Sequence, residues 1–110
     1  MIVRSYRKKP VTIQATRWDG SQDEAREIVE WINGLSGDAH VRDRGWMEEQ
    51  GIDVAQFIGV ENLTHSISIA TLEGDMFVLP GDWVIRGLAG EFYPCKNEIF
   101  EQSYVSVGRA

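Results

Sequence analysis

Apolar and polar residues alternate over much of the chain, and this pattern predicts a protein built mainly from strands. The segment Val11–Trp18 has apolar residues at every second position near its start, which is typical of a half-buried strand. The same signals predict strands over Ala39–Arg42, Ile52–Val60, Ser66–Leu72, Trp83–Arg86 and Glu91–Tyr93, another that ends before Pro80, and a last edge strand at Val105 and Val107.

A Gly followed by an acid and then by bulky apolar residues occurs three times, at Gly74, Gly81 and Gly90. Because Gly accepts a positive φ and the acid tolerates turn geometry, each pair predicts a turn. We therefore expect an antiparallel meander here, in which turn formation is reason enough for the acids. With Glu73-Gly74 as a two-residue turn, the first hairpin sets Ile69 opposite Val78.

The clearest helix signal lies between the first two strands. Ser21 and Glu24 have the spacing of a capping box, which satisfies exposed N–H groups at a helix start. Asn33-Gly34 provides a stop, so we expect an amphipathic helix over about residues 22–33. Its apolar stripe consists of Ala25, Ile28, Val29 and Ile32.

A second, short helix is expected over about residues 97–103. Asn97 can cap it, and Ile99, Phe100 and Ser103 are expected to face inward. The predicted fold is α+β: five to seven mostly antiparallel strands in a curved sheet or small β-barrel, with one amphipathic helix. So few helices argue against a parallel doubly wound fold.

The region 34–51 is rich in Gly and polar residues and carries little periodicity beyond Ala39–Arg42. A loop of this length without its own structure is uncommon in a compact domain unless it is functional or disordered. We therefore expect this segment to be mobile or to face a ligand.

The chain has 110 residues, a usual size for a single domain, and a net charge of −6 that is unevenly distributed. An N-terminal arm, residues 1–9, carries four bases and no acid, whereas the remainder carries seven bases and all 17 acids. An acidic body opposes attraction to nucleic acid or an anionic membrane. The arm is expected to dock on the acidic body of its own chain or of a partner; gripping phosphate is the alternative.

Cys95 is the only cysteine, which excludes an intramolecular disulfide and a Cys-based metal site. This usage fits a reducing cytoplasm, and neither a membrane-spanning run nor a signal peptide is expected. His40 and His65 lack metal-ligand spacing. We expect no metal, no cofactor and no catalytic group. A Cys95 activated by Lys96 is considered, but a small apolar role is favoured.

Ligand binding is the chemistry that remains. Aromatic faces beside Arg or Lys suit planar anionic ligands such as nucleotides. Core packing and ion pairs with the many acids would explain the same residues. The candidate ligand-binding residues are Arg86, Tyr93, Lys96, Trp18, Trp46, Arg42 and Arg44. If a ligand exists, we expect Arg86, Tyr93 and Lys96 to meet the loop that holds the other two arginines and Trp46.

Two stretches resemble a family of small bacteriophage and prophage proteins. One is PGDWVIRGLAGEFYPCKNEIFEQSY, residues 80–104, and the other runs from Arg4 to Gly20 as R-x-x-R-K-K-P-V-x-I-x-A-x-x-W-D-G. Asn97-Glu98 stands where the family has Pro-Asp, and Leu88-Ala89 where it has Val-Lys. The resemblance implies a phage accessory protein acting in the bacterial cytoplasm, and it carries over no catalytic residue.

These observations lead to three hypotheses. The first is a non-enzymatic, homo-oligomeric protein that binds and sequesters a small host metabolite or nucleotide signal. The second is a protein–protein interaction module, either an inhibitor of a host protein or a minor assembly factor. The third is an enzyme that acts through Cys95 or a carboxylate pair.

Overall fold

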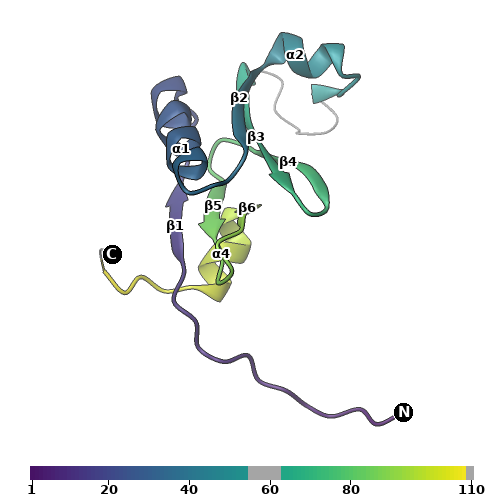
Figure 1. Ribbon diagram of the computed structural model, residues 1–110, viewed down its shortest axis with the longest axis vertical. Helices are drawn as coiled ribbons and strands as arrows, with labels where there is room; N and C mark the ends of the chain where they lie inside the picture. The colour runs from purple at the N-terminus through teal and green to yellow at the C-terminus, as the bar shows by residue number, and fades with distance from the viewer. Residues whose placement is uncertain (55–62, 109–110) are drawn as a thin grey trace.

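The computed structural model describes residues 1–54 and 63–108, and the fold is α+β (Figure 1). Two antiparallel sheets of three strands each form, with the orders β1-β5-β6 and β2-β3-β4. The strands are β1 Gln14–Arg17, β2 Ala39–Asp43, β3 His65–Thr71, β4 Gly74–Val78, β5 Trp83–Arg86 and β6 Phe92–Cys95, and the helices are α1 Gln22–Gly34, α2 Arg44–Glu49 and α4 Asn97–Ser103.

The predicted meander is divided between these two sheets, so neither one curved sheet nor a closed barrel forms in the described part of the chain. The cause is the turn at Pro80 and Gly81, which separates β4 from β5 and sends the chain to the other sheet. The predicted positive φ is present at Gly74, Gly81 and Gly90. Gly81 and Gly90 lie in turns as predicted, whereas Gly74 is the first residue of β4 and directly follows its turn.

One core joins both sheets to α1. The apolar stripe of the helix packs against strand residues from each sheet, and Trp31 meets Phe92 edge to face with ring centroids 5.2 Å apart. Burial of this apolar surface is the main stabilising contribution. The buried members are Trp18, Ala25, Ile28, Ile32, Ala39, Ile67, Ile69, Val78, Val84 and Phe92.

The helix α1 starts as the capping box predicts, with one difference. The N–H of Glu24 donates to the Ser21 hydroxyl at 3.2 Å. The Glu24 carboxylate, however, accepts from the N–H of Asp19 at 3.1 Å, whereas the N–H of Ser21 donates to the Asp19 carboxylate at 2.8 Å. Hydrogen bonds from Ser21 also lower the pKa of Asp19 below its usual range. The cap therefore extends into the preceding turn and fixes the exit from β1.

The predicted register of the β3–β4 hairpin is wrong by two residues. Ile67, not Ile69, lies opposite Val78, because the turn consists of Leu72 and Glu73. Thr71 stabilises this turn, since its hydroxyl donates to the carbonyl of Gly74 and accepts from the N–H of Glu73. A shift of two residues keeps every side chain on its predicted face.

Three further expectations about chain segments need correction. The region 34–51 is not a loop, since it contains β2 and α2, whose N-cap Asp43 accepts from the N–H of Trp46 at 2.7 Å. Val105 and Val107 form no strand and are exposed. The strand expected over 52–60 falls mostly outside the described residues, and residues 52 and 53 are not in a strand.

The predicted C-terminal helix is present, but its start and its contacts differ. Lys96, not Asn97, is the N-cap, and no side chain caps the helix. The side-chain oxygen of Asn97 instead accepts a hydrogen bond from the indole N–H of Trp83 in β5. Ile99 and Ser103 are exposed, and the helix packs through Phe100. The reason is that a helix of two turns presents only a narrow stripe to the sheet.

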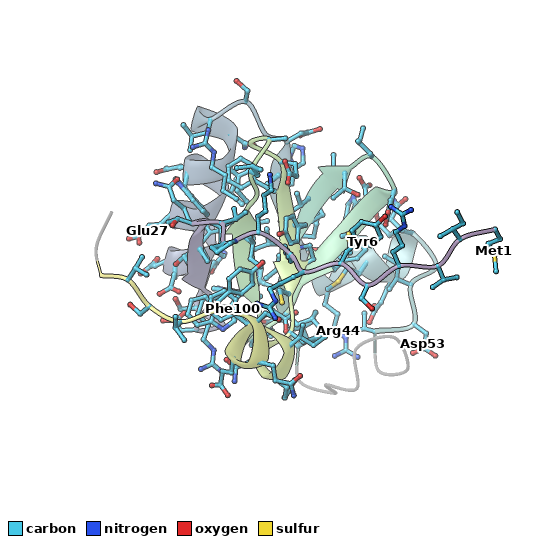
Figure 2. All side chains as sticks on the ribbon, turned by 90° about the horizontal axis from the view of Figure 1, so that it is seen from below. Met1, Tyr6, Glu27, Arg44, Asp53 and Phe100 are labelled. Atoms are coloured by element: carbon cyan, nitrogen blue, oxygen red, sulfur yellow. The ribbon has the colours of Figure 1, made fainter. Side chains whose placement is uncertain are left out.

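The N-terminal arm does not dock on the acidic body of its own chain. Residues 1–12 are all exposed, and the arm extends away from the sheets (Figures 1 and 2). Its apolar side chains are as exposed as its bases, with Ile2 at 79%, Val3 at 80% and Tyr6 at 89%. Docking on a partner and gripping phosphate are the two expectations for the arm that stay predictions.

Candidate functional site

The turn between the two sheets is built by the residues of the PGDW motif. The N–H of Asp82 donates to the carbonyl of Leu79 at 2.9 Å, and Gly81, the third residue of the turn, has a φ of 90°. These features define a type II turn, in which Pro80 supplies the fixed φ of the second position. Two backbone hydrogen bonds then fasten the turn to Trp18. The motif therefore determines where the chain crosses between sheets.

Asp82 is a buried carboxylate with a complete set of partners. Its side chain is 8% exposed, and it accepts from the N–H of Leu79 at 3.0 Å and from the Lys96 ammonium at 3.0 and 3.1 Å. Burying a charge is costly unless it is paired and hydrogen-bonded. Lys96 is thus the counter-ion of the turn, and this use of Asp82 goes beyond the turn role that its sequence position predicts.

Aromatic residues next to the Asp82–Lys96 pair connect β5 to the C-terminal helix α4. The Trp83 indole N–H donates to the side-chain oxygen of Asn97 at 3.0 Å, and the Trp83 ring stacks on Phe100 with centroids 3.8 Å apart. Phe100 in turn contacts Tyr104 at 4.9 Å. Burial, and then a side-chain hydrogen bond with Tyr104, raise the pKa of Tyr93 to about 12. Tyr93 is therefore part of the packing between β6 and the C-terminal residues.

Cys95 lies on the same hairpin and is not activated. Burial, followed by the negative charge of Asp82, raises the pKa of its thiol. A reactive cysteine needs a lowered pKa. The sequence allowed Lys96 to supply that effect, but the Lys96 ammonium is engaged by Asp82. The nucleophilic hypothesis for Cys95 thus loses its physical basis.

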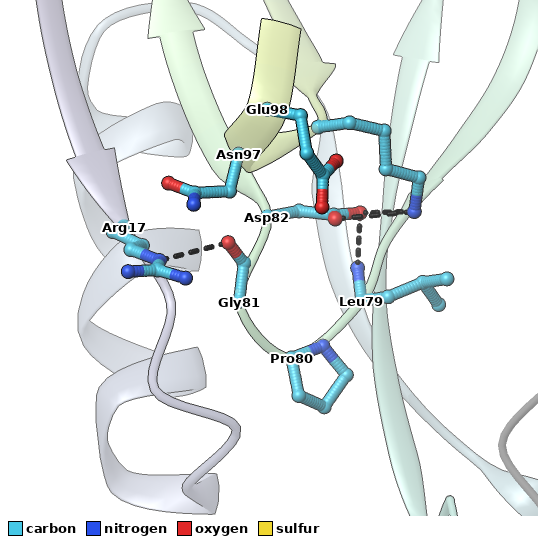
Figure 3. Close-up of a pocket in the computed structure, with 8 residues that line it drawn as sticks. Arg17, Leu79, Pro80, Gly81, Asp82, Asn97 and Glu98 are labelled. Atoms are coloured by element: carbon cyan, nitrogen blue, oxygen red, sulfur yellow. Dashed lines mark hydrogen bonds and ion pairs between the residues drawn. The ribbon is translucent and has the colours of Figure 1, made fainter. Parts of the chain in front are cut away.

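Two shallow depressions lie beside the turn. The first, of about 290 Å³, lies between the turn and the start of α4 (Figure 3) and the second, of about 370 Å³, lies beside α1. Arg17 and Gly81 line both and are joined by a hydrogen bond of 2.9 Å from Arg17 Nε to the Gly81 carbonyl. Both depressions are open to solvent, and Asp82 and Lys96, which line the first, are already paired with each other. This region is suited to holding the fold together rather than to enclosing a ligand.

The remaining candidates of the first sheet are constrained in different ways. Trp18 has no exposed surface, and its indole N–H donates to the Ser21 carbonyl, so it cannot touch a ligand. Arg86 lies at the end of β5, where Nη1 donates to the Gln14 side chain at 3.4 Å. Its Nε is buried and has no hydrogen-bond partner among residues 1–54 and 63–108.

A second group of candidates lies on the other sheet, and we call it the Arg42 surface. It consists of Arg42, Trp46, Ser68 and Phe77. The Arg42 guanidinium lies over the Trp46 ring at 4.1 Å from the centroid, and its Nε donates to the Ser68 hydroxyl at 3.1 Å. The Phe77 and Trp46 rings are 6.4 Å apart. The surface thus combines a fixed cation with two aromatic rings.

The strand pattern explains why these residues gather on one face. Ser66 and Ser68 alternate with Ile67 and Ile69 along β3, and the isoleucines face the main core. The serines therefore face the opposite side, where α2 covers part of the sheet and Ser66 donates to the sulfur of Met47 at 3.2 Å. Arg42 reaches this polar face from β2. It forms no ion pair within residues 1–54 and 63–108, although the chain has 17 acids.

The structure therefore divides the predicted site in two. Arg42 and Trp46 are brought together. Arg44 lies between them in the sequence, at the start of α2, and its Nε is 2.9 Å from the Glu48 carboxylate. Arg86, Tyr93 and Lys96 belong to the other sheet, and Arg86 and Lys96 lie at opposite ends of the β5–β6 hairpin. Sequence reasoning missed Ser68 and Phe77. The alternation along β3 and the hairpin register were the signals that could have placed them beside Arg42.

Within the described ranges, no group of three or more His, Cys, Asp and Glu residues could hold a metal ion. None of the helices described here has the length and apolar character needed to cross a bilayer. No protein-family model matches the chain, and no curated protein or solved structure shows significant similarity to it.

Proposed function

We propose that the protein is a non-enzymatic binding protein that recognises an anionic, planar small molecule of the nucleotide class at the Arg42 surface. The observation that carries this proposal is the position of the Arg42 guanidinium, which is held by Trp46 and by Ser68 but forms no ion pair with a described acid. A role as a phage accessory protein in the bacterial cytoplasm accords with the sequence resemblance and is part of the same proposal.

The way in which Arg42 is held favours anion recognition. A guanidinium is a planar fork that binds carboxylate or phosphate through two parallel hydrogen bonds. Stacking on Trp46 and the Nε bond to Ser68 fix the fork, while the two Nη groups make no hydrogen bond with a described residue. An arginine that is already ordered loses little side-chain entropy on binding.

The aromatic neighbours favour a planar group beside the anion. Phe77 lies next to Trp46 on the same surface and is only partly buried. A base that stacks on an aromatic side chain gains about 1–3 kcal/mol. A ligand with a phosphate and a base would therefore use both parts of the surface, whereas inorganic phosphate would use only Arg42.

Calorimetric titration with separated parts of a nucleotide tests this proposal. We expect AMP or a cyclic dinucleotide to bind, and inorganic phosphate and adenosine each to bind at least about tenfold more weakly, since a charged hydrogen bond contributes about 1.5–3 kcal/mol. Mass spectrometry of small molecules released from denatured protein, purified from bacteria, would identify the natural ligand. No heat with any nucleotide, together with an empty extract, would refute the proposal.

A protein–protein interaction module is the second candidate, and the exposed arm favours it. Residues 1–12 place both bases and large apolar side chains in solvent. Such a segment gains contacts when it docks on another protein surface. The two depressions beside the turn are shallow and open to solvent, which is also compatible with a flat protein partner. Stoichiometric recovery of one host protein by the wild-type chain, lost on removal of residues 1–9, would favour this function.

A further inference from the structure

The strand pattern of the sequence continues upstream of the point where β1 begins. Alternation starts at Val11, yet pairing with β5 starts at Gln14. The reason is that β5 ends at Arg86, opposite Gln14, and the chain then turns, with the N–H of Gly90 donating to the Gly87 carbonyl. Residues 11–13 thus have a strand-forming sequence but no partner strand within the described structure.

The strand β1 also has an open edge. It is the outer strand of the order β1-β5-β6, and on the side away from β5 it makes no backbone hydrogen bond with another described residue. An exposed edge of this kind is a template for pairing with another chain. The sequence does not protect it with a Pro or with an acid between residues 11 and 17.

The helix that follows β1 is acidic on its outer side. Asp23, Glu27 and Glu30 are exposed, and Arg26 is the only base of α1. Glu27 points away from the body of the protein (Figure 2). The helix lies above the end of β1, whereas the arm runs downwards from the start of β1 (Figure 1). One chain thus carries a basic segment before the start of β1 and an acidic helix after its end.

We propose that two copies of this chain pair through the open edges of their β1 strands, antiparallel and about a twofold axis. In an antiparallel pair, the residues that precede β1 in one copy lie beside those that follow β1 in the other. The basic arm of each copy then lies along the acidic side of its partner's α1. Both contacts occur twice, as an isologous interface requires. This pairing is independent of the Arg42 surface, which lies on the other sheet.

A charge exchange tests the arm contact. One variant carries Lys8→Glu and Lys9→Glu, and the other carries Glu27→Lys and Glu30→Lys. Each variant alone places like charges together in both arm contacts, so we expect the mass of one chain, 12.4 kDa, by light scattering at low salt. The equimolar mixture places opposite charges together in both contacts, so we expect twice that mass. A mixture that stays at the single-chain mass would overturn the proposal.

A proline pair tests the strand contact. Trp18 N–H donates towards β5 at Asp82, so alternation directs the N–H of Thr12 inward and that of Ile13 outward. Neither residue pairs with β5. Ile13→Pro removes an outward donor and should give the single-chain mass with an unchanged circular dichroism spectrum, whereas Thr12→Pro should remain a dimer. A wild-type chain of single mass, or equal loss in both variants, would contradict the proposal.

Discussion

Lys96 and Arg42 are two cations that sequence reasoning assigned to the same ligand site, and the structure gives them opposite surroundings. The Lys96 ammonium lies 3.0 Å from a buried carboxylate and neutralises it. The Arg42 guanidinium lies on Trp46 and is oriented by a neutral hydroxyl. The first cation is therefore needed by the fold, and the second has charge to offer to a ligand.

This difference teaches how to separate structural from functional charges in a chain with many acids. A structural cation is matched to an acid whose burial it makes tolerable. A binding cation is held in position by uncharged groups, so that its charge is not compensated before the ligand arrives. Exposure alone does not separate the two, because Lys96 is about half exposed. The partner is the informative property.

The largest effect is expected for Asp82→Ala. The change leaves the N–H of Leu79 without its acceptor and Lys96 without its partner. Breaking a buried pair costs about 3–5 kcal/mol, and because Lys96 is half exposed we expect about 3 kcal/mol in the free energy of unfolding, measured by urea denaturation. Nucleotide binding by the folded fraction should not change, since Asp82 is not part of the Arg42 surface.

Asp75→Ala is the matched control for this change. Asp75 follows Gly74 as Asp82 follows Gly81, but it is exposed. Its replacement should cost less than about 0.5 kcal/mol, as is usual for exposed positions without special contacts. Equal losses in the two variants would show that the acid of the turn motif matters only for turn formation, and the contrast between buried and exposed acids would be wrong.

A smaller effect is expected from alkaline pH. The pKa of Tyr93 is raised to about 12 from 10.0, by burial first and by Tyr104 second. In this range the unfolded chain loses the phenol proton before the folded protein does, so the free energy of unfolding should fall as pH rises from 10 towards 12. Tyr93→Phe should reduce this dependence, measured by urea denaturation at each pH. A wild-type curve that is flat or rises would contradict the assignment.

Local features of the fold could be predicted from the sequence because their causes are local. The cap at Ser21, the stripe of α1 and the glycines of the turns each depend on neighbouring residues. The division into two sheets could not, since it depends on how the turn at Pro80 and Gly81 docks on Trp18, far away in the sequence. The region of α2 was also missed, because a six-residue helix carries almost no periodicity.

The site could be predicted only in part, for a related reason. Arg42 and Trp46 are four residues apart, so their contact is nearly a local property. Ser68 and Phe77 join them only through strand pairing. Conversely, Lys96 looked available because the acid that engages it, Asp82, is 14 residues away. Residue type indicates what a side chain can do, whereas its partner in space decides whether it is available.

A small change in stability, with the largest change in binding, is expected for Arg42→Gln. Its matched variant is Lys96→Gln, which removes the same charge from the other sheet. Calorimetric titration with the same nucleotide, beside urea denaturation of both variants, tests the central claim most directly. We predict that Arg42→Gln weakens binding at least about tenfold at a cost in stability of about 1 kcal/mol or less. Lys96→Gln should lower stability by more than this and leave the affinity unchanged; equal affinities of the two variants, or weaker binding by Lys96→Gln, would contradict the account.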